Sequence, residues 1–304
     1  MIVCHKIAWS ACLSNTIFPL IEKGWSRWQH EKPIHFFWGL GANNINEIRR
    51  CQAKGEEWWL VDLGYISNHI KRYPNPDILD VSKTYFRFCK GGLHNDLKNV
   101  SADENRLNEL KDKNIFHAVD LDNYKQKAQN KNGPVLLAPS SPTVCKFMHQ
   151  MNQENWVNQA ANNITKNAEI RKTIRFRNKP RPGNKWYETD IRDDLNGASA
   201  LVTNMSLAAV DAIVAGVPVI CHKDNICSSI ATTFFEKINN LNTPTKKQVT
   251  TWMAKAANCQ FTLEEIGNGT AKHTIENYHN RNEQDVSTLP SVVDGSDSST
   301  YSRD

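Results

Sequence analysis

The sequence lacks the short motifs that identify the most common catalytic and metal-binding proteins. It contains no H-E-x-x-H zinc motif, no G-x-S-x-G nucleophile turn and no G-x-x-x-x-G-K-[ST] phosphate loop. Its eight cysteines are too few for a fold built on disulfides, and the closest pair, Cys221 and Cys227, does not have the C-x-x-C spacing of a zinc site. Hydrolase and P-loop activities therefore have no support in the sequence, and we expect reduced, packed thiols.

Long hydrophobic runs are also absent. Lys6 and Pro19 interrupt the apolar stretches at the start of the chain. No segment approaches the ~20 apolar residues that are needed to span a bilayer. We therefore expect a cytoplasmic protein without a membrane span.

Basic residues are concentrated in one segment instead of being spread along the chain. The net charge is +5, yet residues 171–185 contain seven Lys and Arg and no acidic residue, so the rest of the chain is close to neutral. This distribution excludes a generally basic protein that coats nucleic acid.

The basic segment includes a predicted strand with cations at alternate positions. The period of two in a strand places Arg175, Arg177 and Lys179 on one face and Phe176 on the other. Such a row of cations favours a phosphate-bearing ligand. Two alternatives remain open: an edge strand whose cations prevent aggregation, and contacts from residues 171–185 to nucleic-acid phosphates.

The first part of the chain predicts alternating strands and helices. The apolar run 34–38 ends at Gly39, and a helical stretch over 43–54 and a second apolar run over 58–62 follow it. These segments form one βαβ unit. We expect residues 1–24 to add another strand and helix before it.

A clearer alternation follows residue 134, where four apolar runs separated by helical stretches predict a parallel sheet covered on both faces. These runs are 135–138, 173–177, 200–203 and 217–221. Thr245 and Thr262 open two further helices with capping-box sequences. The predicted divisions of the chain are an N-terminal domain over 1–130, a second domain with trailing helices over 131–279, and a disordered tail over 280–304.

Polar residues follow the predicted strands of the second domain, at the edge where open α/β sheets bind ligands. Ser140 and Ser141 follow one strand, and His222 follows another. Ser206 opens the helix predicted over 206–215, where backbone N–H groups and a hydroxyl can bind a phosphate. An ordinary helix cap is the alternative.

The first domain offers a different set of candidates. Gly39-x-Gly41 lacks the third glycine of a dinucleotide-binding turn, so a nicotinamide or flavin site is not predicted. Asp62 ends a strand, where a carboxylate acts as a general base or only forms a turn. The Asp-x-Asp pattern at 120–122 is too common to assign a metal site.

Segments 134–142, 174–182 and 200–219 resemble the nucleotide-sugar-binding half of GT-B glycosyltransferases, especially capsule-type and phage-encoded proteins. Trp38-Gly39 and the segment 61–65 also resemble the phage group. The resemblance implies two Rossmann-like domains that face a cleft, and a phage-encoded member would act in the host cytoplasm.

The resemblance also implies roles for particular residues. Ser206 meets the donor phosphates, and Asp211 takes the place of an acidic residue, usually Glu, that contacts the ribose. The implied activity is metal-independent transfer of a sugar, with the nucleotide-sugar as co-substrate and no other cofactor, to a glycan, a protein or a modified DNA base. A nucleotide-sugar epimerase and a nucleic-acid-binding module are the alternatives.

We therefore predict a donor side, an acceptor side and one catalytic base, Asp62. The donor-side candidates are Ser140, Ser141, Arg175, Arg177, Lys179, Asn204, Met205, Ser206, Asp211 and His222. The acceptor-side candidates are Gly39, Asn43, Tyr65 and His94.

Overall fold

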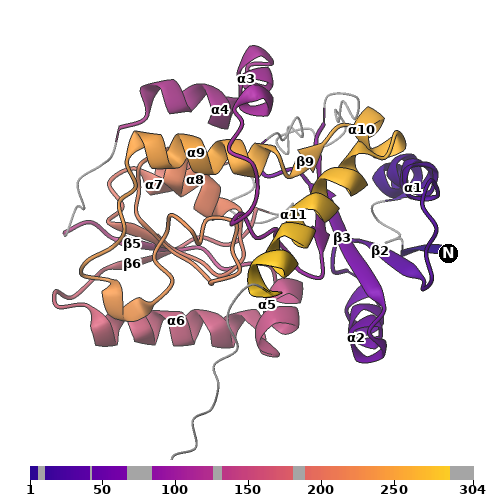
Figure 1. Cartoon of the computed structure of the whole chain (residues 1–304). Coiled ribbons are helices and arrows are strands. Elements are labelled where there is room, and N and C mark those ends of the chain that lie inside the picture. The colour runs from indigo at the N-terminus through magenta and orange to yellow at the C-terminus, as the bar shows by residue number, and fades with distance from the viewer. Residues whose placement is uncertain (6–10, 42, 67–83, 126–131, 181–188, 288–304) are drawn as a thin grey trace, which may run out of the picture.

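The structure is a computed structural model that describes residues 1–5, 11–41, 43–66, 84–125, 132–180 and 189–287. The end of the basic segment, residues 181–185, and the end of the predicted tail, residues 288–304, lie outside the described residues. Two β-sheets with helices packed on them form the fold (Figure 1).

The first sheet has five strands in the order β1-β2-β3-β4-β9. The strands are β1 (Ile2–His5), β2 (Ile34–Trp38), β3 (Glu57–Leu63), β4 (Phe86–Lys90) and β9 (Gln260–Phe261). β1, β2 and β3 are parallel, as the expected βαβ unit requires. The prediction of purely parallel sheets is wrong here, because β4 is antiparallel to β3 and β9 is antiparallel to β4. An antiparallel strand can join an otherwise parallel sheet because it needs no helical crossover.

The second sheet has four strands in the order β6-β5-β7-β8, and every neighbouring pair is parallel. The strands are β5 (Val135–Leu137), β6 (Ile174–Phe176), β7 (Ala200–Val202) and β8 (Val219–Ile220). The four apolar runs of the sequence thus form one parallel sheet, as predicted. β6 is its edge strand.

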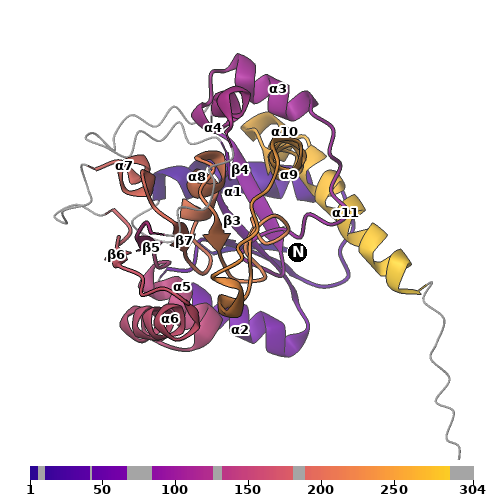
Figure 2. The ribbon, with the colours of Figure 1, turned by 90° about the vertical axis from the view of Figure 1, so that its left-hand side faces the viewer.

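Helices cover both faces of the second sheet. Figures 1 and 2 show α5 and α6 on one side of it and α7, α8 and α9 on the other. Alternate residues explain the two faces, because Leu137 belongs to the same core cluster as Trp156 and Ile164 of α6. Leu136 belongs to a different cluster, which contains Val210 of α8. The bounds are α5 (Pro142–His149), α6 (Gln153–Asn167), α7 (Ile191–Leu195), α8 (Ala208–Val214), the short η4 (Phe235–Lys237) and α9 (Lys246–Ala257).

The remaining helices pack on the first sheet or bridge the two sheets. They are α1 (Ala11–Trp25), α2 (Asn44–Lys54), α3 (Asn105–Asp112), α4 (Phe116–Asp120), η3 (Leu121–Asn123), α10 (Leu263–Gly267) and α11 (Thr270–Ser287). α1, α10 and α11 contact one another. α2 packs against β3, whereas α3 and α4 contact α9 and α8, respectively. No helix among the described residues combines the length and hydropathy of a membrane span.

The C-terminal part of the chain returns to the first sheet. We expected residues 131–279 to form one domain, but β9 pairs with β4 and α10 packs on α1. The approach of α1 and α10 requires Gly24, since a Cβ there would lie 2.1 Å from the carbonyl oxygen of Ile266. Residues 280–287, the start of the predicted disordered tail, continue α11.

An aromatic cluster fills the face of the first sheet that α1 covers. The Trp25 ring lies 5.1 Å from that of Phe36, 5.8 Å from that of Trp59 and 5.3 Å from that of Phe88. Such pairs add about 0.5–1.5 kcal/mol each beyond the area that they bury. On the opposite face, Leu60 belongs to a core cluster that also contains residues of the second sheet, so the two sheets share a core.

Both predicted capping boxes are present. The Thr245 hydroxyl accepts a hydrogen bond from the backbone N–H of Gln248, and Thr262 does the same for Glu265. The seven cysteines whose side chains are described are free thiols, and six of them are buried. The predicted reduced, packed thiols are therefore confirmed for these residues.

Candidate functional site

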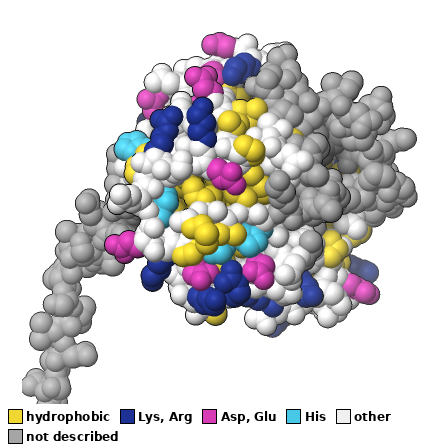
Figure 3. Space-filling model, turned by 90° about the vertical axis from the view of Figure 1, so that its right-hand side faces the viewer, with side chains coloured by type: hydrophobic (Ala, Val, Ile, Leu, Met, Phe, Trp, Pro, Cys, Tyr) yellow, Lys and Arg dark blue, Asp and Glu magenta, His cyan; other side chains and the backbone are white. Residues whose placement is uncertain are grey.

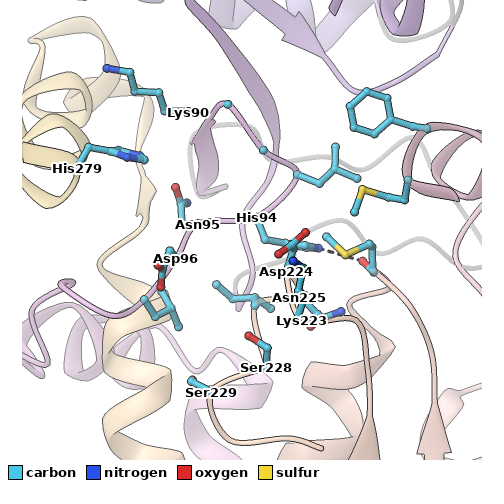
Figure 4. A pocket seen from close by; sticks show the side chains of 18 of the residues that line it. Lys90, His94, Asn95, Asp96, Lys223, Asp224, Asn225, Ser228, Ser229 and His279 are labelled. Carbon is cyan, nitrogen blue, oxygen red and sulfur yellow. Dashed lines mark hydrogen bonds between the residues drawn. The ribbon is translucent and has the colours of Figure 1, made fainter. Parts of the chain in front are cut away.

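A hollow of about 570 Å³ lies where the two sheets meet (Figure 4). Lys90, the last residue of β4, and residues 91–97 form one wall. Met205, which follows β7, and residues 223–229, which follow β8, form the opposite wall. His279 of α11 also lines it. The hollow therefore combines the carboxyl edge of the second sheet with a loop of the first.

The wall from the first sheet depends on a turn directly after β4. Gly91 has a φ of 69°, which favours glycine. Its N–H donates a hydrogen bond to the carbonyl of Trp58 at 3.0 Å. Further along, the backbone N–H of Asn95 donates to the Tyr65 hydroxyl at 3.0 Å. These contacts hold the loop over the sheet, so that His94 faces the second wall.

His94 connects the two walls. Its Nε2 lies 3.0 Å from the carbonyl oxygen of Met205, which can only accept, so Nε2 carries the proton. Nδ1 is buried and has no hydrogen-bond partner among the described residues. Burial, together with the charge of Arg87, lowers the pKa of His94 to about 3. The ring is therefore neutral, and its Nδ1 is a hydrogen-bond acceptor that no described residue uses.

Charged groups of both signs line the hollow. Lys90 is ion-paired with Glu57 at 3.0 Å. Lys223 is exposed and forms no ion pair among the described residues. Asp96 and Asp224 supply carboxylates from the two opposite walls (Figure 4). Lys223 is thus the cation most available to an anionic ligand.

Asp62, the predicted base, lies outside the residues that line this hollow. Its Oδ2 accepts a hydrogen bond from Arg87 at 2.9 Å, and its Oδ1 accepts one from the backbone N–H of Leu63 at 2.8 Å. Arg87 is 7% exposed and also contacts the Tyr65 ring. Both oxygens of Asp62 are therefore engaged in holding the end of β3 against β4.

Three predicted donor-side residues connect the loops that follow β5 and β7. The backbone N–H of Ser140 donates to Asn204 Oδ1 at 3.0 Å, and the backbone N–H of Met205 donates to the Ser140 hydroxyl at 3.0 Å. Of these three, Met205 lines the hollow. Ser141 caps α5 by accepting from Val144 N–H.

Ser206 and Asp211 have partners within the protein. The Ser206 hydroxyl accepts a hydrogen bond from the N–H of Ala208, where α8 begins, two residues later than predicted. Asp211 lies 2.9 Å from His117 Nε2 of α4. The Ser206 hydroxyl thus bonds the first residue of α8, although Leu207 and not Ser206 is the N-cap residue, and Asp211 connects α8 to α4.

The basic strand does not have the predicted alternation. Arg177 is 3% exposed, whereas Phe176 is 39% exposed. Arg177 turns inward because its guanidinium forms an ion pair with Asp194 and donates to the hydroxyl and carbonyl oxygens of Thr189. Arg175 remains exposed and donates to the Asp194 carbonyl at 3.3 Å. The predicted single cationic face, including Lys179, is therefore interrupted at Arg177.

A second hollow of about 220 Å³ lies between α6 and the carboxyl ends of β7 and β8. Asn204 and His222, both predicted donor-side residues, line it. Thr203 is 3% exposed, and its hydroxyl has no hydrogen-bond partner among the described residues. The buried Nε2 of His149 also has no hydrogen-bond partner among the described residues. The described lining contains Trp156 but no Lys, Arg, Asp or Glu, which suits an uncharged group.

The acceptor-side candidates other than His94 have structural partners. Gly39 turns the chain after β2 with a φ of 63°. Asn43 is exposed and contacts Asn46 and Glu47. Tyr65 is buried and holds the loop of His94, as described above.

The sequence motifs do not include Lys90, Asp96, Lys223 or Asp224. Lys223 and Asp224 directly follow His222, so the rule that ligands bind beyond the strand ends could have found them. Asp96 had no such signal, because its place in the hollow depends on the turn at Gly91 and the contact with Tyr65.

The contact between α4 and α8 is expected to depend on pH. Burial alone would lower the pKa of His117, but the hydrogen bond and charge of Asp211 raise it above its usual value of 6.5. The pair should stabilise the fold fully below pH 6.5, and this contribution should be lost as the pH rises through the raised pKa. NMR titration of His117 measures its pKa. Asp211→Asn should lower the His117 pKa, and an unchanged pKa in that variant would contradict the pairing.

Comparisons with known proteins complete the description of the site. No protein-family model matches the chain, and no curated protein matches it. A solved structure similar to the chain is KpsC, a beta Kdo 2,7 transferase of Thermosulfurimonas dismutans. The similarity covers 90% of this chain and 98% of KpsC, with 12% identity and a TM-score of 0.45. Residues of this chain, and not this similarity, therefore indicate its function.

Proposed function

We propose that this protein transfers a sugar from a nucleotide-sugar to a hydroxyl group, and that the reaction takes place in the 570 Å³ hollow. The proposal is based on the residues that the two opposite walls of this hollow present. One wall is the carboxyl edge of a parallel sheet with the available cation Lys223, and the other presents His94 and Asp96. Ligands of open α/β sheets bind at that edge.

The two hollows suit different parts of a nucleotide-sugar. The diphosphate is anionic and fits the hollow that contains Lys223 and Lys90. The nucleoside is uncharged and contains a flat base, which fits the smaller hollow beside Trp156. The chain passes from one hollow to the other at Asn204–Met205 and His222–Lys223. We therefore propose that one donor extends from the first hollow to the second.

Lysine side chains can support the departure of the nucleotide without a metal ion. The leaving diphosphate gains negative charge as the glycosidic bond breaks, and positioned cations stabilise that charge. Lys223 is the main candidate. Lys90, already paired with Glu57, is a second one. Transfer is therefore proposed as metal-independent.

The acceptor hydroxyl must lose a proton, and Asp96 is the proposed base. One of its oxygens accepts a hydrogen bond from the N–H of Lys98 at 2.9 Å, and the other has none among the described residues. Asp62, predicted from the sequence, has both oxygens engaged. His94 is too weak a base at a pKa of about 3, so its proposed role is to orient a hydroxyl through Nδ1.

Nucleotide titration tests the proposal directly. Calorimetry with a panel of nucleoside diphosphates and nucleotide-sugars should detect binding, and Lys223→Gln should weaken it by roughly 10- to 100-fold through the loss of a charged contact. Lys247→Gln is the matched control, because Lys247 is an exposed lysine of α9 outside both hollows. No binding of any nucleotide, or an equal loss in both variants, would refute the proposed donor site.

Two further measurements separate the alternatives. An epimerase would convert the donor without an acceptor, whereas a transferase requires one. A nucleic-acid-binding module would be saturated by DNA alone, with steep salt dependence. On the face seen in Figure 3, coloured Lys and Arg side chains lie among Asp and Glu side chains. Arg177 is also paired within the protein, so a transferase is better supported than a nucleic-acid-binding module.

A further inference from the structure

Three side chains with metal-binding atoms meet beneath α2, and none of them lines the 570 Å³ hollow. His35 lies on β2, Cys51 on α2 and Glu56 directly before β3. The His35 ring nitrogen, the Cys51 Sγ and a Glu56 carboxylate oxygen all lie within 4.8 Å of one another. Nitrogen, thiolate sulfur and carboxylate oxygen form a typical donor set for zinc.

His35 provides the strongest sign that the cluster binds an ion. Its side chain is 5% exposed, and its Nε2 has no hydrogen-bond partner among the described residues. That Nε2 nevertheless lies 3.2 Å from Glu56 Oε2. Zinc bonds of about 2.0 Å to nitrogen and oxygen in a tetrahedral site separate the two ligand atoms by about 3.3 Å. The His35–Glu56 spacing therefore fits a metal ion that contacts both.

His5 contacts the other nitrogen of the His35 ring. Its Nε2 lies 3.0 Å from His35 Nδ1, at the end of β1. When His35 Nδ1 donates its proton to His5, His35 Nε2 keeps a lone pair that faces Cys51 and Glu56. Such a second partner fixes the tautomer and the ring orientation of a metal-binding histidine.

Arg50 is the group that competes for the same carboxylate. One guanidinium nitrogen lies 3.1 Å from Glu56 Oε2, and another lies 3.9 Å from Cys51 Sγ. Arg50 also contacts Glu47 at 2.8 Å, and its side chain is 36% exposed. It can therefore move outward and keep Glu47 as its partner when a cation reaches Glu56.

We propose that His35, Cys51 and Glu56 bind a zinc ion, with water as the fourth ligand, and that this ion holds α2 against β2 and β3. The role is structural and separate from the proposed transfer reaction. The spacing of the three residues in the sequence matches no metal motif, because strand pairing and the packing of α2 bring them together.

Titration of the full chain with Co²⁺ tests the site. Binding through Cys51 should produce the near-ultraviolet charge-transfer absorption of a cobalt thiolate, and Zn²⁺ should displace it. Cys51→Ser should abolish the band, whereas Cys4→Ser, which changes a half-buried thiol of β1, should retain it. Absence of the band in the unchanged protein, or its persistence in Cys51→Ser, would overturn the proposal.

Two more variants test the site by changes in Co²⁺ affinity, measured on folded protein. Arg50→Ala should raise the affinity for Co²⁺ several-fold because it removes the competing charge. His35→Gln should lower the affinity at least tenfold, measured on protein that circular dichroism shows to be folded in the presence of a chelator. Equal or weaker binding in Arg50→Ala would count against an ion at Glu56.

Discussion

Replacing Asp96 by asparagine is expected to lower the turnover of sugar transfer by about 10² to 10⁴ and to leave donor affinity nearly unchanged. A base acts on the acceptor proton only as the new bond forms, so its loss slows the reaction more than it weakens binding. Asp96 lines the hollow on the wall opposite Lys223 and has one carboxylate oxygen without a hydrogen bond among the described residues. Steady-state kinetics together with calorimetry on the same variant measure both effects.

Asp62→Asn is the comparison that decides between the two carboxylates. It keeps the shape of the side chain but removes the charge that pairs with Arg87. We expect this variant to lose stability and to keep most of its turnover per folded molecule. If Asp62→Asn abolishes turnover while Asp96→Asn retains it, Asp62 is the base, as predicted from the sequence.

Arg177→Ala should lower the free energy of unfolding by about 2 to 3 kcal/mol. The Arg177 guanidinium is buried and bound to Asp194 and Thr189, so its removal leaves those oxygens without their donor. Urea unfolding followed by circular dichroism measures the change. The side chain should matter for folding more than for nucleotide binding.

Arg175→Ala is the matched control for this prediction. Arg175 is exposed, and its one hydrogen bond among the described residues reaches the Asp194 carbonyl at 3.3 Å, so the variant should change stability by less than about 0.5 kcal/mol. An unchanged unfolding free energy in Arg177→Ala, combined with weaker nucleotide binding, would restore the phosphate-binding hypothesis for this strand.

The sequence predicts the parallel sheets where strand, helix and strand are neighbours along the chain. The runs 135–138 and 200–203 were recognisable because their apolar residues are continuous and helical stretches separate them. The same local reasoning found β2, α2 and β3. In each case the pairing partners lie within one or two crossovers of each other.

Contacts between distant segments could not be predicted in this way. Gln260–Phe261 is too short a segment to indicate a strand, and its pairing with β4 joins residues more than 170 positions apart. The inward turn of Arg177 depends on Asp194, which lies 17 positions further along the chain. Asp96 reaches the hollow only because Tyr65 holds its loop. Tertiary contacts, not local patterns, determine these positions.

The return of β9, α10 and α11 to the first sheet has a consequence for how the protein is made. A ribosome releases α1 and β1 to β4 well before the strand and helices that cover β4 and α1, which lie more than 170 residues further along the chain. The first sheet therefore keeps an open edge and an aromatic face that only α1 covers until residues 260–287 have emerged, whereas the second sheet, formed from contiguous residues, can close sooner. Nascent chains of this protein thus depend on residues 260–287 to bury hydrophobic surface that was made much earlier.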